Sequence, residues 1–218
     1  MSSDRVPRDI IDTYLEQLLS LQYKASDWIS HPGTKGSLRE KFLWQIIKGE
    51  FPSLLLENGD VEQKRGSHRQ LDLIWIKSTA RVGQLSYYDI EDCKLIVEIK
   101  SVAKKSEMDA LNQSLSIYRA MQNVCPNLQV GMFCYSTNAQ KKTVLSKLGF
   151  DYDVELDAYS GYNNDTDIYP HVNFLFSLDL NDAEPRPYFV FRDNNGGNVL
   201  MQESPAITHF LRLFQQEI

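Results

Sequence analysis

Two apolar runs of this chain are each interrupted by ionisable residues. The first run, residues 70–76, reads Gln-Leu-Asp-Leu-Ile-Trp-Ile and carries Asp72. The second run, residues 95–101, reads Leu-Ile-Val-Glu-Ile-Lys-Ser and carries Glu98 and Lys100. Such runs are typical of buried strands. Because an isolated buried charge is very costly, we expect these carboxylates to be paired, protonated or bound to a metal.

The alternation of side chains along a strand places Glu98 and Lys100 on one face, with Val97 and Ile99 on the other. If Asp72 lies on a neighbouring strand and faces the same way, two carboxylates and one ammonium converge. This layout can hold Mg²⁺, which prefers oxygen ligands, and can activate a water. The structural alternative is a same-face ion pair, which the Glu-x-Lys pattern also produces by chance.

Length and composition allow one large domain or two small ones. The chain has 218 residues, of which 42% are hydrophobic, so it can bury a substantial core. We expect no membrane span, because no apolar stretch reaches about 18 residues. The three cysteines match no zinc pattern and favour free thiols in a reducing cytoplasm.

The charge is unevenly distributed. The net charge of −6 and the pI of about 5.3 argue against non-specific nucleic-acid binding. Basic residues nevertheless gather near the predicted site, so a basic groove could attract phosphates; the alternative for residues 64–69 is a solvated hairpin. These basic residues are Lys35, Arg39, Lys41, Lys64, Arg65, His68, Arg69, Lys100, Lys104 and Lys105.

The order of predicted elements favours an α/β fold with a mixed, helix-flanked sheet. Apolar spacing predicts helices over residues 4–30, from Ser37 to the Gly49–Pro52 break, over 106–121 and over 140–148. Strands are predicted over 54–62, 70–76, 95–101 and 128–135.

The last third is richer in strand signals. Residues 151–169 are acidic and rich in tyrosine, and we expect a solvated loop there, although its tyrosines could also stack on bases. Strands are predicted over 172–178, 188–192 and 199–201, followed by a terminal helix from Ser204. We therefore expect one domain over residues 1–218, with a catalytic core at 1–150 and a β-rich elaboration at 151–218 for activator binding or subunit contacts.

An acid followed by Glu-x-Lys on adjoining strands resembles the PD-(D/E)xK nuclease superfamily, although Leu71 replaces the usual proline. Together with His31-Pro32-Gly33-x-Lys35-Gly36 and the acid Glu40, the pattern resembles NucC-type endonucleases, which are activated by cyclic nucleotides in bacterial anti-phage (CBASS and type III CRISPR) systems. The resemblance implies a restriction-endonuclease-like core. It also implies a homotrimer that binds a cyclic trinucleotide and pairs with another trimer to cut double-stranded DNA.

The same resemblance assigns roles to individual residues. Asp72 and Glu98 would be the metal ligands for Mg²⁺, with Mn²⁺ as an alternative, and Lys100 would be the catalytic lysine. Glu40 matches an acid that helps to hold the metal through water. Its structural alternative is a capping box with Ser37 at the start of a helix.

These residues predict a Mg²⁺-dependent DNA endonuclease in anti-phage defence. Two other classes stay open. One is a sequence-specific restriction endonuclease that needs no activator. The other is a non-catalytic binding module of the same fold, in which the acid–base pairs are only structural.

Overall fold

The fold is organised around one eight-stranded mixed sheet. The computed structural model describes residues 8–64, 67–77, 87–120, 128–193, 195–202 and 206–215. The strand order is β10-β9-β8-β5-β4-β2-β1-β3, and β6 and β7 form a separate two-stranded sheet. The strands are β1 (Leu56–Lys64), β2 (Ser67–Ile76), β3 (Tyr87–Asp89), β4 (Cys93–Ala103), β5 (Gln129–Thr137), β6 (Leu148–Asp153), β7 (Ala158–Asp167), β8 (Phe174–Ser177), β9 (Tyr188–Arg192) and β10 (Asn198–Gln202).

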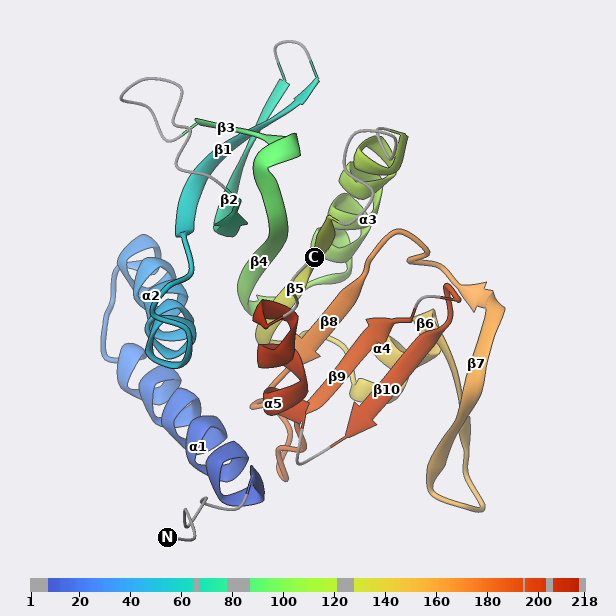
Figure 1. Ribbon diagram of the computed structural model, residues 1–218. Coiled ribbons are helices and arrows are strands. Elements are labelled where there is room, and N and C mark those ends of the chain that lie inside the picture. The colour runs from blue at the N-terminus through green and yellow to red at the C-terminus, as the bar shows by residue number, and fades with distance from the viewer. Residues whose placement is uncertain are drawn as a thin grey trace, which may run out of the picture.

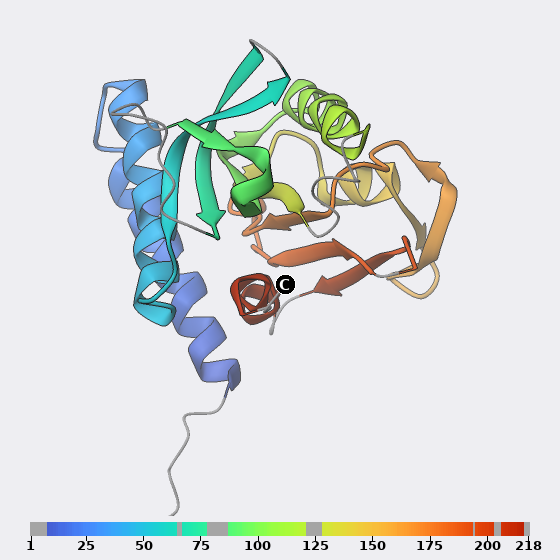
Figure 2. The same ribbon diagram turned by 45° about the horizontal axis from the view of Figure 1, so that its top comes forward.

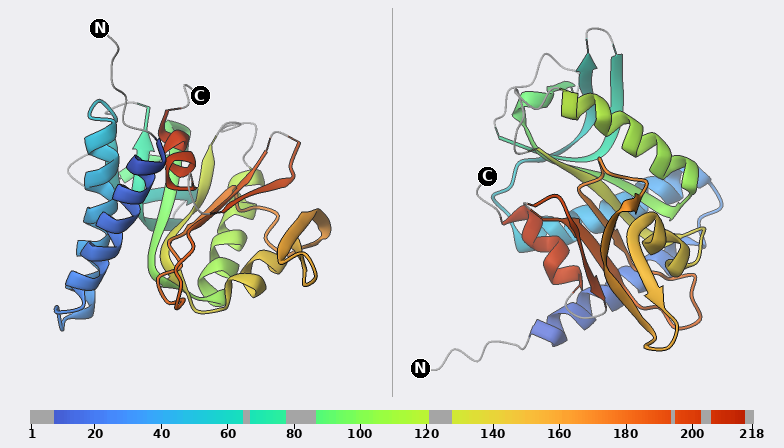
Figure 3. Two further views of the ribbon diagram at one scale, coloured as in Figure 1. Left: turned by 90° about the horizontal axis from the view of Figure 1, so that it is seen from below. Right: turned by 90° about the vertical axis from the view of Figure 1, so that its right-hand side faces the viewer.

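Helices cover both faces of the sheet (Figures 1 and 3). They are α1 (Arg8–Ser26), α2 (Pro32–Glu50), α3 (Lys105–Ala120), α4 (Lys141–Lys147) and α5 (Ala206–Leu211), with short 3₁₀ turns at Ile90–Asp92 and Arg212–Phe214. One apolar cluster lies between the sheet and α1, α2 and α5, and a second lies between the sheet and α3 and α4. Figure 2 shows α1 and α2 packed side by side along the sheet. This three-layer arrangement confirms the predicted α/β class.

The centre of the sheet is parallel. Strands β4 and β5 pair in parallel, and α3 makes the crossover that such a pair requires. Strand β8 adds in parallel to β5, whereas β2 adds antiparallel to β4. The buried centre explains the nearly continuous apolar runs in the sequence.

Side chains of β4 alternate between the two apolar clusters. Val97 and Ile99 belong to the cluster under α1, α2 and α5, while Ile96 belongs to the cluster under α3 and α4. Glu98 and Lys100 therefore leave the strand on the side opposite to Val97 and Ile99, as alternation predicts.

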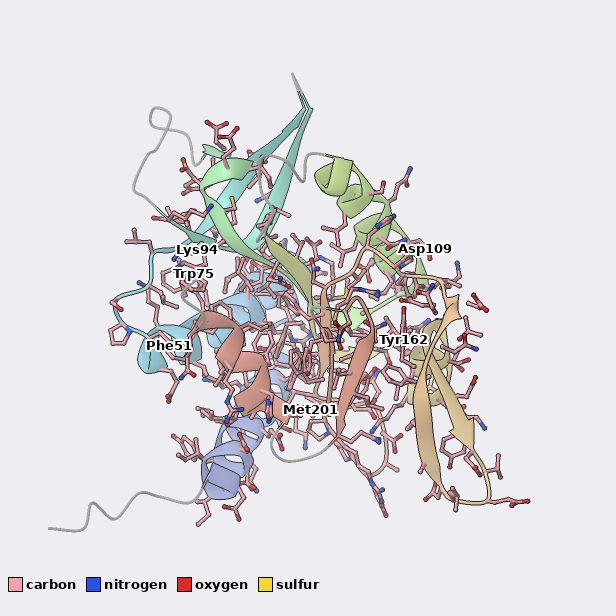
Figure 4. The ribbon with its side chains drawn as sticks, turned by 45° about the vertical axis from the view of Figure 1, so that its right-hand side comes forward. Phe51, Trp75, Lys94, Asp109, Tyr162 and Met201 are labelled. Carbon is pink, nitrogen blue, oxygen red and sulfur yellow. The ribbon has the colours of Figure 1, made fainter. Side chains whose placement is uncertain are left out.

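The C-terminal strands extend the main sheet. Strand β9 pairs antiparallel with both β8 and β10, and β8 joins this group to the core by pairing with β5. The predicted terminal helix is present as α5, and its apolar side chains Ile207, Phe210 and Leu211 are buried. Figure 4 shows Phe51 and Trp75 on the α5 side, with Asp109 and Tyr162 towards α3 and the β6–β7 hairpin.

Two local expectations are wrong. Helix α2, which the sequence analysis starts at Ser37, begins instead at Pro32, because His31 caps it by accepting a hydrogen bond from the Thr34 amide. The acidic segment 151–169 is not a solvated loop but contains the β6–β7 hairpin. Its Asp167 is buried and pairs with Arg192 at 2.7 Å, which fastens the hairpin to the sheet.

Two further observations concern thiols and membranes. Cys93 and Cys134 are buried thiols that take part in no disulfide among the described residues, and Cys125 lies outside those residues. Within the described ranges, no helix combines the length and apolarity that a bilayer crossing needs.

Candidate active site

The first site residue, Asp72, lies on β2 beside β4. Leu73, the neighbour of Asp72, pairs with Val97, the neighbour of Glu98, in the antiparallel ladder of β2 and β4. The backbone N–H of Ile99 donates to Asp72 Oδ2 at 2.7 Å. The Asp72 carboxylate is therefore fixed across the strand pair rather than turned towards bulk water.

Lys100 joins the two carboxylates. Its Nζ lies 2.7 Å from Glu98 Oε1 and 3.5 Å from Asp72 Oδ2. All three side chains are largely shielded, with exposed fractions of 24% for Lys100, 19% for Asp72 and 10% for Glu98. The structure thus brings together the three residues that the sequence pattern singles out.

Burial and charge shift the protonation equilibria of this group. Burial raises the pKa of Asp72 and the charge of Glu98 raises it further, while Lys100 and the Ile99 amide oppose this only in part. For Lys100, burial lowers the pKa, but the charges of Glu98 and Asp72 outweigh it, so the pKa lies above its usual value. The negative charge of Asp72 is therefore unfavourable in this setting, and a further cation would relieve it.

Glu40 extends the acidic group from α2. It lies in the interior of the helix, because α2 begins at Pro32, so the capping box with Ser37 is wrong. Burial raises the pKa of Glu40, and the negative charge of Asp72 raises it further. The positive charge of Lys100 lowers this pKa in part, and the charge of Glu98 raises it again. Glu40 is therefore within electrostatic range of all three strand residues.

A groove opens beside Asp72 between α2 and β1. Its volume is about 350 Å³, and Glu40 and Asp72 both line it. The other lining residues are Ser37, Lys41, Trp44, Glu57 and Asn58. Sequence reasoning placed Lys41 near the site but missed Trp44, Glu57 and Asn58, although Ser37, Lys41 and Trp44 recur at the i, i+4, i+7 spacing of one helical face.

The basic residues near the site divide into two kinds. Arg39 is buried and, with Lys35, pairs with Asp27 at 2.8 and 3.1 Å, so neither is a free cation of the groove. Lys105 pairs with Asp109 on α3. Lys41 is exposed and lines the groove. The side chains of Lys64, Arg65, His68 and Arg69 lie outside the described residues.

The donor set fits a magnesium ion that keeps part of its water shell. In the described ranges, no three acidic, histidine or cysteine side chains form a closed metal site. Mg²⁺ needs only one or two carboxylates when waters and phosphate complete its shell. Asp72 and Glu98 both approach the Lys100 ammonium, so their oxygens already converge on one positive charge.

Comparison with known proteins concerns the fold. No protein-family model and no curated protein matches the sequence. Among solved structures, cAAA-bound NucC of E. coli MS115-1 superposes with a TM-score of 0.68 at 12% identity, covering 99% of this chain and 92% of that chain. The chain has a NucC-type fold. The restriction-endonuclease-like architecture expected from short motifs is thereby confirmed.

Two further structures agree. cAAA-bound NucC of P. aeruginosa ATCC27853 has a TM-score of 0.66 at 11% identity, with 98% of this chain and 93% of that chain covered. The apo form of the E. coli protein has a TM-score of 0.58 at 11% identity, with coverages of 94% and 89%. Because the likeness extends over nearly the whole chain, the C-terminal strands belong to the shared fold.

Proposed function

We propose that this protein is a Mg²⁺-dependent endonuclease that cuts double-stranded DNA. One observation carries the proposal: in a NucC-type fold, the Lys100 ammonium lies within 3.5 Å of both the Asp72 and Glu98 carboxylates. Two carboxylates that can hold a metal ion, with a lysine beside them on two central strands, can supply the charge stabilisation and the activated water that phosphodiester hydrolysis uses.

The residues divide the chemistry between them. Asp72 and Glu98 would hold the ion, and Glu40 would hold a water of its shell. When bound, Mg²⁺ supplies positive charge to the scissile phosphate and acidifies a water. The Lys100 Nζ donates to the attacking oxygen or to a phosphate oxygen, where negative charge develops. The Ile99 amide keeps Asp72 oriented during this change.

We further propose that the enzyme acts in the cytoplasm in anti-phage defence and that a cyclic trinucleotide activates it. The support is that two NucC structures of this fold are cAAA-bound forms. Assembly into a homotrimer, and pairing of trimers, would join several grooves of an otherwise acidic chain on one DNA molecule. Such joining raises the effective affinity without a new contact.

The test is plasmid digestion with Mg²⁺, with and without a panel of cyclic di-, tri- and tetranucleotides that includes cAAA. We expect cleavage with a cyclic trinucleotide only. Asp72→Asn, Glu98→Gln and Lys100→Ala should abolish it in folded protein, whereas Lys105→Ala, which removes an exposed ion pair, should not. Normal cleavage by all three site variants would remove the assignment.

The same experiment separates the two other classes. Discrete fragments without any cyclic nucleotide would indicate a sequence-specific restriction endonuclease. Absence of cleavage under every condition, together with no thermal shift from Mg²⁺ or Mn²⁺, would indicate a binding module without catalysis.

A further inference from the structure

Helix α1 carries large apolar side chains on its outer face, at the edge of the molecule (Figure 1). Ile10, Tyr14 and Leu21 are 56%, 62% and 65% exposed, and their i, i+4, i+11 spacing places them in one row. Trp28, in the turn that ends the helix, extends this outer row and is 93% exposed. The inner face of α1 is buried against the sheet through residues such as Leu19. The fold of a single chain therefore leaves the outer row uncovered.

The outer row is large for the surface of a monomer. An aromatic side chain offers about 150–250 Å², so Tyr14 and Trp28 alone expose roughly 200–400 Å². Ile10, Ile11 and Leu21 add to this area. Monomeric proteins rarely expose contiguous apolar patches above a few hundred Å², and a standard interface buries about 800 Å² from each partner. With polar residues at its rim, the outer face of α1 approaches the area that a stable dimer needs.

Charges at the rim indicate which partner fits. Asp9 lies in the first turn of α1 and Lys24 in the last turn, and both are exposed. At about 100° per residue, both lie roughly 60–100° from the outer row and on the same side of it. In an antiparallel pair related by a two-fold axis, equivalent flanks of the two helices meet, so each Asp9 faces the partner's Lys24. A parallel pair would bring opposite flanks together and lose this complementarity.

A membrane surface fits this face less well. Amphipathic helices that lie on membranes are rich in Lys and Arg on their polar side. Helix α1 instead carries the acids Asp9, Asp12 and Glu16, and the whole chain has a net charge of −6. Acid at one end of the row and base at the other end complement a second copy of the same helix.

We infer that the outer face of α1 is a two-fold interface between two copies of this chain, with their α1 helices antiparallel. With Tyr14 opposite the partner's Leu21, Asp9 lies within about 3 Å, along the helix axis, of the partner's Lys24. A two-fold contact cannot close a trimer, so this surface is distinct from contacts around a three-fold axis. The inference does not depend on the proposed nuclease activity.

Sedimentation equilibrium of the full chain at micromolar concentration tests the interface. We expect the wild type to have a mass that is an even multiple of the 25.1 kDa chain. Leu21→Glu places an unpaired charge inside the interface and should halve that mass, as should Trp28→Ser, which removes the largest exposed side chain. Leu156→Glu is the matched control, because Leu156 is 75% exposed between β6 and β7, and it should leave the mass unchanged.

A charge-reversal mixture tests the orientation of the helices. Asp9→Lys and Lys24→Glu should each weaken self-association by about 10-fold or more, because like charges then meet at both ends of the interface. An equimolar mixture of the two variants should restore the wild-type mass, since each reversed charge meets its opposite in the other variant. The mixture keeps any effect of the substitutions on α1 itself, so only the contact between copies changes.

Four results would overturn the inference. The first is a wild-type mass equal to an odd number of chains. The second is a Leu21→Glu protein with the wild-type mass, and the third is a charge-reversal mixture that associates no better than its components. The fourth is flotation of the wild type with phosphatidylcholine vesicles that Leu21→Glu abolishes, which would assign the outer row to lipid.

Discussion

At the residue scale, the candidate site holds more negative charge than its lysine can balance. Asp72, Glu98 and Glu40 interact electrostatically with one another and with Lys100. Neutral isosteres would relieve this repulsion and would also remove the groups that a metal needs. Buried charges that lower the stability of the folded protein are typical of functional sites rather than of ion pairs with a structural role.

Glu40→Gln tests this trade directly. Because burial and Asp72 raise the pKa of Glu40 in the folded state, ionised Glu40 destabilises the protein above that pKa, and protonation removes the cost as the pH falls. We expect Glu40→Gln to have a higher Tm than the wild type at pH 8 without metal, and the difference to vanish near pH 4. A difference that grows on acidification, measured by thermal unfolding across pH, would contradict this.

Residue patterns predicted part of the site. Alternation along β4 correctly placed Glu98 and Lys100 on one face, because a strand has only two faces. The role of Glu40 was ambiguous, because a Ser-x-x-Glu sequence is compatible with a helix start, whereas the true cap is His31. The sequence analysis counted Arg39 among the cations that could meet a phosphate. The structure buries it against Tyr23, and this burial could not be predicted because it depends on contacts between distant elements.

At the element scale, the short helix α5 is held by aromatic packing. The ring of Phe210 lies 5.2 Å from that of Phe176 and 5.5 Å from that of Phe133, between centroids. Asp12 of α1 also accepts a hydrogen bond from the Thr208 amide at 3.1 Å. A helix of one to two turns would not persist without such contacts, so its stability comes from the sheet beneath it.

Phe210→Ala should therefore destabilise the whole fold. Removing a fully buried ring leaves a cavity, and we expect a loss of about 3–5 kcal/mol in the free energy of unfolding. Denaturant titration measures it, with Leu156→Ala as the control, because Leu156 is 75% exposed and should cost less than about 0.5 kcal/mol. A loss for Phe210→Ala as small as that of the control would show that α5 is not anchored in the core.

Element prediction worked best where periodicity was strong. The strands around Asp72 and Glu98 and the terminal helix α5 match their predicted positions. The β6–β7 hairpin was missed because its strands are rich in Asp, Asn and Tyr, and because the burial of Leu148 and Phe150 depends on packing against distant elements. The Asp167–Arg192 ion pair likewise joins residues that no local pattern links.

At the scale of the whole molecule, the proposed function requires an acidic chain to bind an acidic polymer. With a net charge of −6, this chain can bind DNA only through local positive potential and assembly. Lys41 is an exposed cation in the groove beside Asp72, so it is the described residue best placed to meet a phosphate there.

DNA binding is measured in the Glu98→Gln background, in which we expect no cleavage. In that background, Lys41→Ala should weaken binding to the same extent for all DNA sequences. Loss of one phosphate contact lowers the slope of log K against log salt by about 1. Lys35→Ala is the matched control on the same helix, because Lys35 pairs with Asp27 and should leave the slope unchanged. Fluorescence anisotropy over a salt series measures both slopes, and equal slopes for the two variants would place the DNA elsewhere.

The overall class was predictable because alternating strand and helix signals determine a layered α/β fold. The incorporation of β8, β9 and β10 into the central sheet was not, since pairing partners in a sheet are chosen by long-range contacts. Assembly likewise depends on surfaces between subunits, which a single chain does not define.

The central claim is that Asp72 and Glu98, beside Lys100, hold a divalent metal ion. Anomalous diffraction from crystals soaked in Mn²⁺ tests it most directly. The account predicts one peak at bonding distance, about 2.0–2.3 Å, from carboxylate oxygens of both Asp72 and Glu98, lost in Glu98→Gln crystals. A well-occupied peak elsewhere, or none beside these carboxylates at saturating Mn²⁺, would contradict it.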